Sequence, residues 1–277
     1  MTLTVGSLFS GIGGLDLGLE RAGMQVIWQS EIEPYACKVL KKHWPEVVNH
    51  GDIKSINWRD IVRPDVICGG YPCQPFSHAG KRQGEQDPRH LWPWVRQAIS
   101  ELRPRYAILE NVRGHLSMGG LSVIADLASI GYDAEWRIVS AASVGANHKR
   151  DRIIIVAYPQ SDWKRRGHSQ NTGTLSQWVE IQTTIRGSSS SMADNDCKWN
   201  GINRPPATTR KECVFGSHYA TREAANVSRK WWEIEPDVGR VANGVPSRVD
   251  RLRGLGNAVV PQVAEVIGRL VVEHANA

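Results

Sequence analysis

The sequence predicts an α/β protein with a doubly wound sheet and a small, loop-rich second domain. Short apolar segments alternate with amphipathic helical segments over residues 4–157, a pattern typical of a sheet with helices on both faces. A glycine-rich turn follows the first apolar segment, and the composition changes after Pro159. A chain of 277 residues is long enough for one large and one small domain.

The chain divides into three parts: a first domain over 1–158, a second over 159–239, and a segment over 240–277 that returns to the first domain. The second part has little apolar periodicity, a serine run at 188–191, and five tryptophans interleaved with basic residues. Basic groups among aromatic ones suit a nucleic-acid groove, although a solvated insertion has a similar composition.

Charge and cysteine usage narrow the class of protein. A formal net charge of +6 and a pI of about 9.2 suit a polyanionic partner, although many ordinary enzymes are this basic. The N-terminus has no charged leader, and no apolar run reaches eighteen residues, so we expect no membrane partner. The five cysteines have no Cys-x-x-Cys spacing, so we expect no metal site and a reducing, cytoplasmic compartment.

Apolar periodicity and breakers locate the elements. We predict strands over 4–9, 25–30, 47–50, 65–70, 106–109, 132–139 and 153–157. Helices are predicted over 15–22, 33–43, 91–103, 121–129 and 262–274, the first four ending at a glycine or before a proline.

The glycine turn Ser10-Gly11-Ile12-Gly13-Gly14 joins the first strand to the first helix. Such a turn lets backbone N–H groups approach a ligand, and Glu31, at the end of the second strand, can accept hydrogen bonds from ribose hydroxyls. The spacing departs from Gly-x-Gly-x-x-Gly, which weakens a dinucleotide site and favours another adenosine cofactor. Asp52, after the third strand, either binds an adenine amine or caps a turn.

Cys73 follows the strand over 65–70 and lies between Pro72 and Pro75, which restrict the backbone. Taken alone, such a cysteine is more often a passive part of a tight turn than a nucleophile. The polar segment over 74–90 comes next and carries Lys81, Arg82 and Arg89; it either closes over a polyanion or is an ordinary solvated loop.

Two further charged groups lie at strand ends. Glu110 follows the strand over 106–109, where doubly wound folds place their chemistry. Arg150 and Arg152 alternate at the start of the strand over 153–157, so both project to one side and suit carbonyl or phosphate oxygens. Each also has a simpler interpretation, as an exposed acid or as a basic strand edge.

Together these blocks resemble the cytosine-5 DNA methyltransferase family. The matching blocks are Phe9-Ser10-Gly11-Ile12-Gly13-Gly14, Glu31, Gly51-Asp52-Ile53, Gly70-Tyr71-Pro72-Cys73-Gln74-Pro75-Phe76-Ser77, Glu110-Asn111-Val112, Arg150-Asp151-Arg152 and Gly256-Asn257-Ala258-Val259-Val260-Pro261. Each block alone is a modest indication of the family, but the whole set in this order is specific for it. One departure is His148, where the family usually has glutamine.

The resemblance implies a Rossmann-like sheet that binds S-adenosylmethionine and releases S-adenosylhomocysteine. The cofactor residues it implies are Phe9, Ser10, Gly11, Gly13, Gly14, Leu15, Glu31, Asp52, Ile53, Pro72, Asn257 and Val259. The implied catalytic residues are Cys73, as nucleophile on carbon 6 of cytosine, Glu110, Arg150 and Arg152, with no metal.

The resemblance also implies a target cytosine flipped out of double-stranded DNA, with residues 159–239 reading the flanking bases. We expect a monomer acting at the nucleoid of a bacterial or phage-infected cell, with a cognate restriction endonuclease as a candidate partner. The alternatives are a transfer-RNA cytosine-5 methyltransferase, an NAD-dependent oxidoreductase and a non-catalytic DNA-binding homologue.

Overall fold

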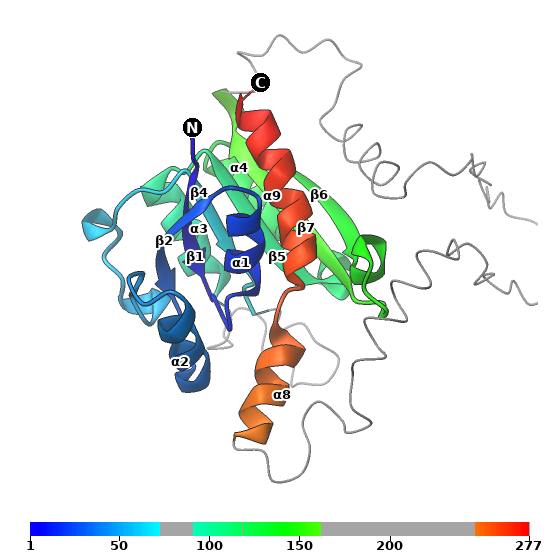
Figure 1. The fold of residues 1–277 in the computed structure, drawn as a ribbon. Helices are drawn as coiled ribbons and strands as arrows, with labels where there is room; N and C mark the ends of the chain where they lie inside the picture. Colours follow the sequence, from blue (N-terminus) through cyan, green and yellow to red (C-terminus); the bar gives the residue numbers. More distant parts are fainter. Residues whose placement is uncertain (73–90, 118, 162–246, 277) are drawn as a thin grey trace, which may run out of the picture.

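The computed structural model describes residues 1–72, 91–117, 119–161 and 247–276 (Figure 1). Cys73, the loop over 74–90 and nearly all of the predicted second domain lie outside the described residues.

The sheet has the strand order β3-β2-β1-β4-β5-β7-β6. Its strands are β1 (Thr4–Leu8), β2 (Gln25–Ser30), β3 (Val48–Asn49), β4 (Val66–Gly69), β5 (Tyr106–Val112), β6 (Tyr132–Ser140) and β7 (Asp151–Pro159). Strands β1 to β5 pair in parallel, whereas β7 is antiparallel to both of its neighbours. The reversed β7 was not predicted. It begins at the edge of the sheet where β5 ends, because Val112 pairs with Arg152.

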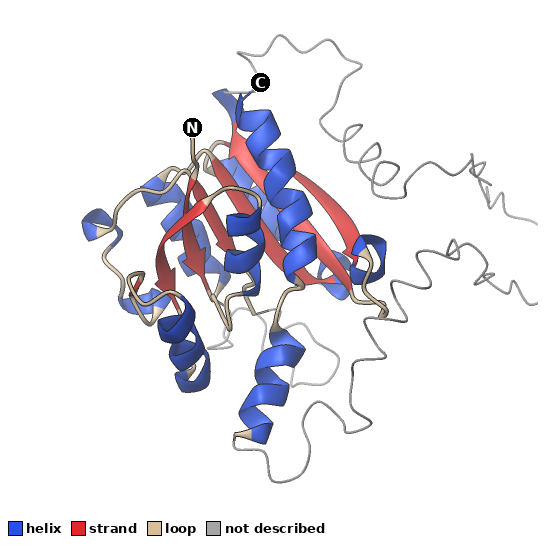
Figure 2. Cartoon of the chain, viewed as in Figure 1, coloured by secondary structure: helices blue, strands red, loops and turns tan. Residues whose placement is uncertain are grey.

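Helices cover both faces of this sheet (Figure 2). They are α1 (Gly14–Arg21), α2 (Pro34–His43), α3 (Trp92–Leu102), α4 (Gly120–Ser129), α8 (Arg248–Asn257) and α9 (Pro261–Asn276), with short 3-10 helices η1 (Ile53–Ser55), η2 (Trp58–Asp60), η4 (Arg113–Ser117) and η5 (Ala141–Val144). Helix α8 was not predicted; it contains Gly254 and Gly256, which are weak helix formers.

Two apolar cores form, one on each face of the sheet. Successive residues of β4 alternate between them: Val66 and Cys68 join the core that includes α1 and α9, and Ile67 joins the core that includes α3 and α4. The central strands are therefore buried on both sides, as in a doubly wound fold.

The last helix of the described chain, α9, lies beside the first, α1 (Figure 1). The two helices approach closely at Gly18, where an added methyl group would overlap with the Pro261 carbonyl oxygen and the Ala264 side chain. Gly268, on α9, in turn leaves room for Ala22 and Leu19. The C-terminal segment thus completes the core next to the glycine turn.

The stretch Val249–Asn276 is long and apolar enough to cross a membrane by length and composition alone. It is divided by a non-helical break between α8 and α9, and α9 buries Val263, Ile267 and Val271 in the core it shares with α1. Packing in a protein core therefore accounts for the apolar side chains of α9.

We predict that Gly18→Ala lowers the free energy of unfolding by about 1–3 kcal/mol, because the methyl group overpacks the contact between α1 and α9. The matched control is Gly256→Ala, on α8, where an added methyl group meets no atom of the described residues within 4 Å. This control should leave stability unchanged or raise it by up to about 1 kcal/mol through helix propensity. Urea unfolding of both variants measures the difference, and equal stabilities would contradict the packing described here.

Candidate active site

The predicted site residues converge on one edge of the sheet. Leu8 pairs with both Ser30 and Gly69, so β1, β2 and β4 end at the same level. Strand β5 extends further along this edge, to the point where β7 begins. In parallel sheets, ligands bind at the carboxyl ends of the strands. The reversed β7 adds residues 150–152 to that edge from the opposite direction.

The turn between β1 and α1 has an unusual backbone. Phe9, Gly11 and Gly13 all lie in the left-handed region, with φ values of 51°, 55° and 83°. For a bulky residue such as Phe9 this conformation costs on the order of 1–3 kcal/mol, and residues of this kind cluster at ligand-binding sites. Helix α1 starts at Gly14 without a side-chain cap, so its first N–H groups face the turn.

Glu31 joins the turn to the end of β2. Its Oε2 accepts a hydrogen bond from the Gly11 N–H at 2.7 Å, and its Oε1 accepts from the N–H groups of Ile32 and Glu33 at 2.8 and 2.7 Å. A carboxylate has about four lone-pair sites, so these three bonds leave acceptor capacity for a ribose hydroxyl. Glu31 therefore organises the turn as well as offering a ligand contact.

The end of β3 supports Glu31 from the other side. The Asn49 Oδ1 accepts from the N–H groups of Glu31 and Gly51 at 3.0 and 3.1 Å, a contact that sequence reasoning missed. The exposed Asp52 caps η1 by accepting from the Lys54 N–H at 3.0 Å, which is the simpler of its two interpretations. The Ile53 side chain is buried in the core with Trp58.

The C-terminal segment packs directly on the glycine turn. A methyl group at Gly14 would overlap with the Val259 carbonyl oxygen, and Asn257 is the exposed last residue of α8. Ser10 is buried and donates to the Ser7 carbonyl, and the Leu15 side chain lies in the core with Val259. These contacts bring residues from both ends of the chain to one place.

Arg150 holds this segment in position. One of its terminal nitrogens donates to the carbonyl oxygens of Gly256 and Ala258 at 2.7 and 2.9 Å. Burial, with a smaller effect from Arg152, lowers the pKa of its guanidinium. Arg150 does bind carbonyl oxygens, as its type suggested, but here they belong to this chain.

Glu110 and Arg152 form an ion pair at the centre of the edge. The Arg152 Nε lies 2.8 Å from the Glu110 Oε1, and Glu110 is only 8% exposed. Burial raises the pKa of the Glu110 carboxyl, while Arg152 and then Arg150 oppose the rise. The other carboxyl oxygen of Glu110 lies close to Gly70, since a methyl group added at Gly70 would be 3.0 Å from it. The acid therefore lies against the backbone that leads to Pro72, which is exposed, and Cys73.

Three side chains that sequence reasoning missed hold that backbone. The Asn111 Nδ2 donates to the Tyr71 carbonyl at 3.1 Å, and the Tyr71 hydroxyl hydrogen-bonds to the His115 Nε2 at 2.8 Å. The Tyr71 ring packs against Trp92 and His115, with ring centroids 5.3 and 5.5 Å apart. Asn111, near the end of β5, and His115, just after it, were the available signals.

A buried carboxyl lies beneath the glycine turn. Asp16 is fully buried and accepts hydrogen bonds from the Ser7 Oγ and the Gln29 Nε2, both at 2.6 Å. Burial raises its pKa to about 6, although both hydrogen bonds oppose the rise. Within the described ranges, no group of three or more His, Cys, Asp or Glu side chains is placed to hold a metal ion.

Residues 3–235 match the family model described as C-5 cytosine-specific DNA methylase. The chain belongs to the C-5 cytosine-specific DNA methylase family. The matched range includes the glycine turn, Cys73, Glu110 and both arginines.

Curated relatives of this methylase include two Type II methyltransferases. M.Eco47II of Escherichia coli is 40% identical over 164 residues, which are 56% of this chain and 39% of the relative. M.NgoMIV of Neisseria gonorrhoeae is 36% identical over 162 residues, 57% of this chain and 52% of the relative. The chain spans about half the length of these relatives, or less.

Among solved structures, a Spodoptera frugiperda DNMT2 mutant matches the methylase with a TM-score of 0.50 and 24% identity. The match covers 57% of this chain and 50% of that one. This likeness confirms the Rossmann-like fold class predicted from the sequence.

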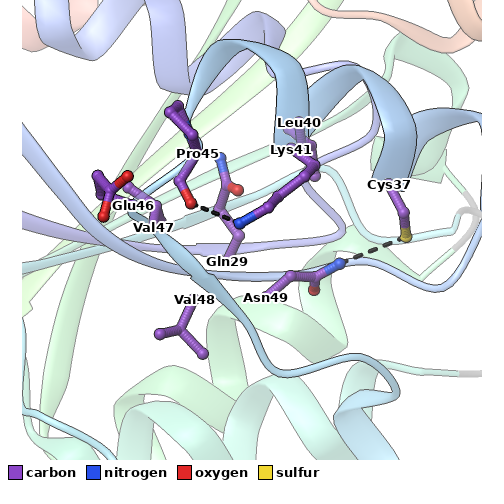
Figure 3. A pocket seen from close by; sticks show the side chains of 9 residues that line it. All are labelled: Gln29, Cys37, Leu40, Lys41, Pro45, Glu46, Val47, Val48 and Asn49. Carbon is purple, nitrogen blue, oxygen red and sulfur yellow. Dashed lines mark hydrogen bonds between the residues drawn. The ribbon is translucent and has the colours of Figure 1, made fainter.

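A hollow of about 310 Å³ lies away from the ion pair of the methylase, between α2 and the ends of β2 and β3 (Figure 3). It is lined by Gln29, Cys37, Leu40, Lys41, Pro45, Glu46, Val47, Val48 and Asn49, none of which is a predicted site residue. Cys37 and Asn49, which line the hollow, both hydrogen-bond to the backbone of Glu31. The hollow therefore lies next to residues that hold Glu31 in place.

We predict that Asp16→Asn changes how the stability of the methylase depends on pH. The folded-state pKa of Asp16, about 6, exceeds the ordinary value of 3.8. The stabilisation that comes from proton binding by Asp16 is therefore fully present below about pH 3.8. It is lost as pH rises through about 6, whereas asparagine stays neutral. Unfolding free energies should therefore shift in favour of the variant by on the order of 2–3 kcal/mol between pH 4 and 7. Parallel pH profiles for the two proteins would contradict this.

Proposed function

We propose that the chain is a DNA (cytosine-5-)-methyltransferase that uses S-adenosylmethionine and a covalent cysteine adduct. The observation that carries the proposal is the buried ion pair between Glu110 and Arg152, next to Gly70. A carboxyl with a raised pKa thus lies against Gly70, which precedes the cysteine of Gly-Tyr-Pro-Cys-Gln by three residues. Membership of the family and the Type II relatives support the same activity.

The residues present fit an adenosine cofactor of this kind. The turn at Phe9, Gly11 and Gly13 lies in the left-handed region, and helix α1 begins directly after it without a side-chain cap. Glu31 retains acceptor capacity for ribose hydroxyls. The predicted set Phe9, Ser10, Gly11, Gly13, Gly14, Leu15, Glu31, Asp52, Ile53, Pro72, Asn257 and Val259 would hold it, Leu15 and Ile53 through their backbone because their side chains lie in the cores. When bound, S-adenosylmethionine supplies the methyl group and is left as S-adenosylhomocysteine.

The protein's own residues would activate the cytosine. The Cys73 thiolate adds to carbon 6, which makes carbon 5 nucleophilic enough to take the methyl group. Glu110 holds a proton at ring nitrogen 3, a role favoured by its raised pKa, and Arg152 keeps that carboxyl in place while its remaining donors face the base carbonyl. Loss of the carbon-5 proton and release of Cys73 then give 5-methylcytosine.

Arg150 would contribute to catalysis through the chain itself. It fixes the Gly256 and Ala258 carbonyls, and so the segment that packs on the glycine turn. Its positive charge also lies close enough to oppose the rise in the Glu110 pKa. The first effect would serve the reaction without direct contact to the base, whereas the second limits how far the Glu110 pKa rises.

The substrate we infer is double-stranded DNA, with the target cytosine flipped out of the helix at a cost of a few kcal/mol. Residues 159–239, rich in basic and aromatic side chains, would select the flanking sequence. We infer that the protein acts as a monomer in the cytoplasm, at the nucleoid of a bacterial or phage-infected cell. The Type II names of the relatives point to a cognate restriction endonuclease as partner.

We predict that Cys73→Ala abolishes transfer of tritium-labelled methyl groups from S-adenosylmethionine to unmethylated genomic DNA, because no thiolate remains to add to carbon 6. The control is Cys37→Ser, at a half-buried cysteine on α2, which should retain activity. Transfer RNA offered in parallel tests the closest alternative substrate. Full turnover by Cys73→Ala would sink the mechanism, and label on transfer RNA alone would replace the proposed substrate.

We predict that Glu110→Gln lowers the methyl-transfer rate by about 10²- to 10⁴-fold, the usual contribution of a positioned acid or base. The variant keeps the size of the side chain and removes its proton exchange and its charge. Glu101→Gln, at a half-buried acid on α3, is the matched control and should transfer at the wild-type rate. Single-turnover kinetics with saturating cofactor measure the effect. An unchanged rate for Glu110→Gln would exclude this residue from the chemistry.

A further inference from the structure

Tyr71 is fixed by three separate contacts just before the described chain stops at Pro72. Its carbonyl accepts from the Asn111 Nδ2 at 3.1 Å, and its hydroxyl hydrogen-bonds to the His115 Nε2 at 2.8 Å. Its ring is 5% exposed and packs against Trp92. The residue therefore ties the end of β4 to β5, α3 and η4.

Burial of the His115 side chain at this position costs free energy. It is only 4% exposed, and its Nδ1 is buried without a hydrogen-bond partner among the residues that the structure describes. In either neutral tautomer one ring nitrogen bonds to Tyr71, while the other loses its hydration and gains no bond to the described part of the chain. Burial also lowers the pKa of the ring, which keeps it neutral. An apolar side chain of similar size would pack here without the buried nitrogen, so stability alone does not account for a histidine.

The position of this bond suggests what it does. Gly70 lies against the Glu110 carboxyl, and Tyr71 is the next residue, two before Cys73. His115 follows Glu110 by five residues, so the bond joins the backbone on the cysteine side to the segment that carries the acid. A displacement of about 1 Å between reacting groups can cost about 10²-fold in rate.

We propose that the Tyr71–His115 hydrogen bond is a positioning device that sets the backbone leading to Cys73 relative to Glu110, with His115 as a positioning residue for methyl transfer. This inference rests on the proposed function, because it assigns Cys73 and Glu110 to the same reaction. It predicts that losing the bond lowers kcat while leaving cofactor affinity nearly unchanged.

The chain contains a matched control for this bond. At the start of β5, the Tyr106 hydroxyl hydrogen-bonds to the His274 Nδ1, also at 2.8 Å, with ring centroids 5.7 Å apart. This second tyrosine–histidine pair lies at the start of β5 and joins α9 to the sheet, whereas the Tyr71–His115 pair lies beyond the other end of β5. Its loss should affect stability without reaching the site.

The experiment compares His115→Leu, Tyr71→Phe and the double variant with Tyr106→Phe and His274→Leu. Melting temperature, kcat and the KM for S-adenosylmethionine are measured with unmethylated genomic DNA. We expect kcat to fall about 10- to 100-fold in both single variants at Tyr71 and His115, with KM changed by less than about threefold. The double variant should be no slower than the single ones, because they remove one bond. His115→Gln, which keeps a polar group facing Tyr71, should recover part of the rate.

The controls at Tyr106 and His274 should lower the melting temperature and keep kcat within about threefold of wild type. If one variant at the Tyr71–His115 pair fails to fold, the other single variant still carries the test. If the wild type is active and the folded variants at Tyr71 and His115 keep its kcat, this inference is wrong while the proposed function stands. Equal rate losses in the control pair also overturn it, since the effect would then be global. A wild type that transfers no methyl group overturns the proposed function as well.

Discussion

The ion pair between Glu110 and Arg152 depends on a reversal of chain direction within the sheet. Strand β7 enters antiparallel beside β5, so Arg152, at its start, meets Glu110, near the end of β5. A carboxylate as buried as Glu110 is costly without a partner, and Arg152 supplies one. Burial still outweighs this attraction, since the net effect on the Glu110 pKa is a rise. The site thereby has an acid that holds a proton more tightly than an exposed glutamate.

The cofactor turn depends in the same way on the far end of the chain. Gly14 and Gly18 leave room for the backbone around Val259 and Pro261, and Arg150 fixes the carbonyls on either side of Asn257. The turn, the returning segment and β7 are therefore one packed unit. A change that displaces the start of α9, around Pro261, should alter the turn as well as the core.

Most of the fold could be predicted because its signals are local. Within the described ranges, apolar runs, glycine turns and prolines located every strand and five of the six longer helices, and strand ends pointed to Glu31 and Glu110. The direction of β7 could not be predicted, since periodicity carries no information on pairing. Helix α8 was missed because packing of Gly254 against Ile12 and Tyr35 outweighs low helix propensity. The partners of Arg150 and the Tyr71–His115 bond depend on contacts between segments far apart in sequence.

The central claim is that Cys73 attacks a cytosine held at the edge occupied by Glu110 and Arg152. The most direct measurement is peptide mass mapping of the complex formed with S-adenosylmethionine and DNA containing 5-fluorocytosine. Fluorine at carbon 5 cannot leave as the proton does, so the adduct should persist. We expect a single modified peptide, with the nucleotide joined to Cys73. An adduct on another residue, or methylated DNA formed without any adduct, would contradict it.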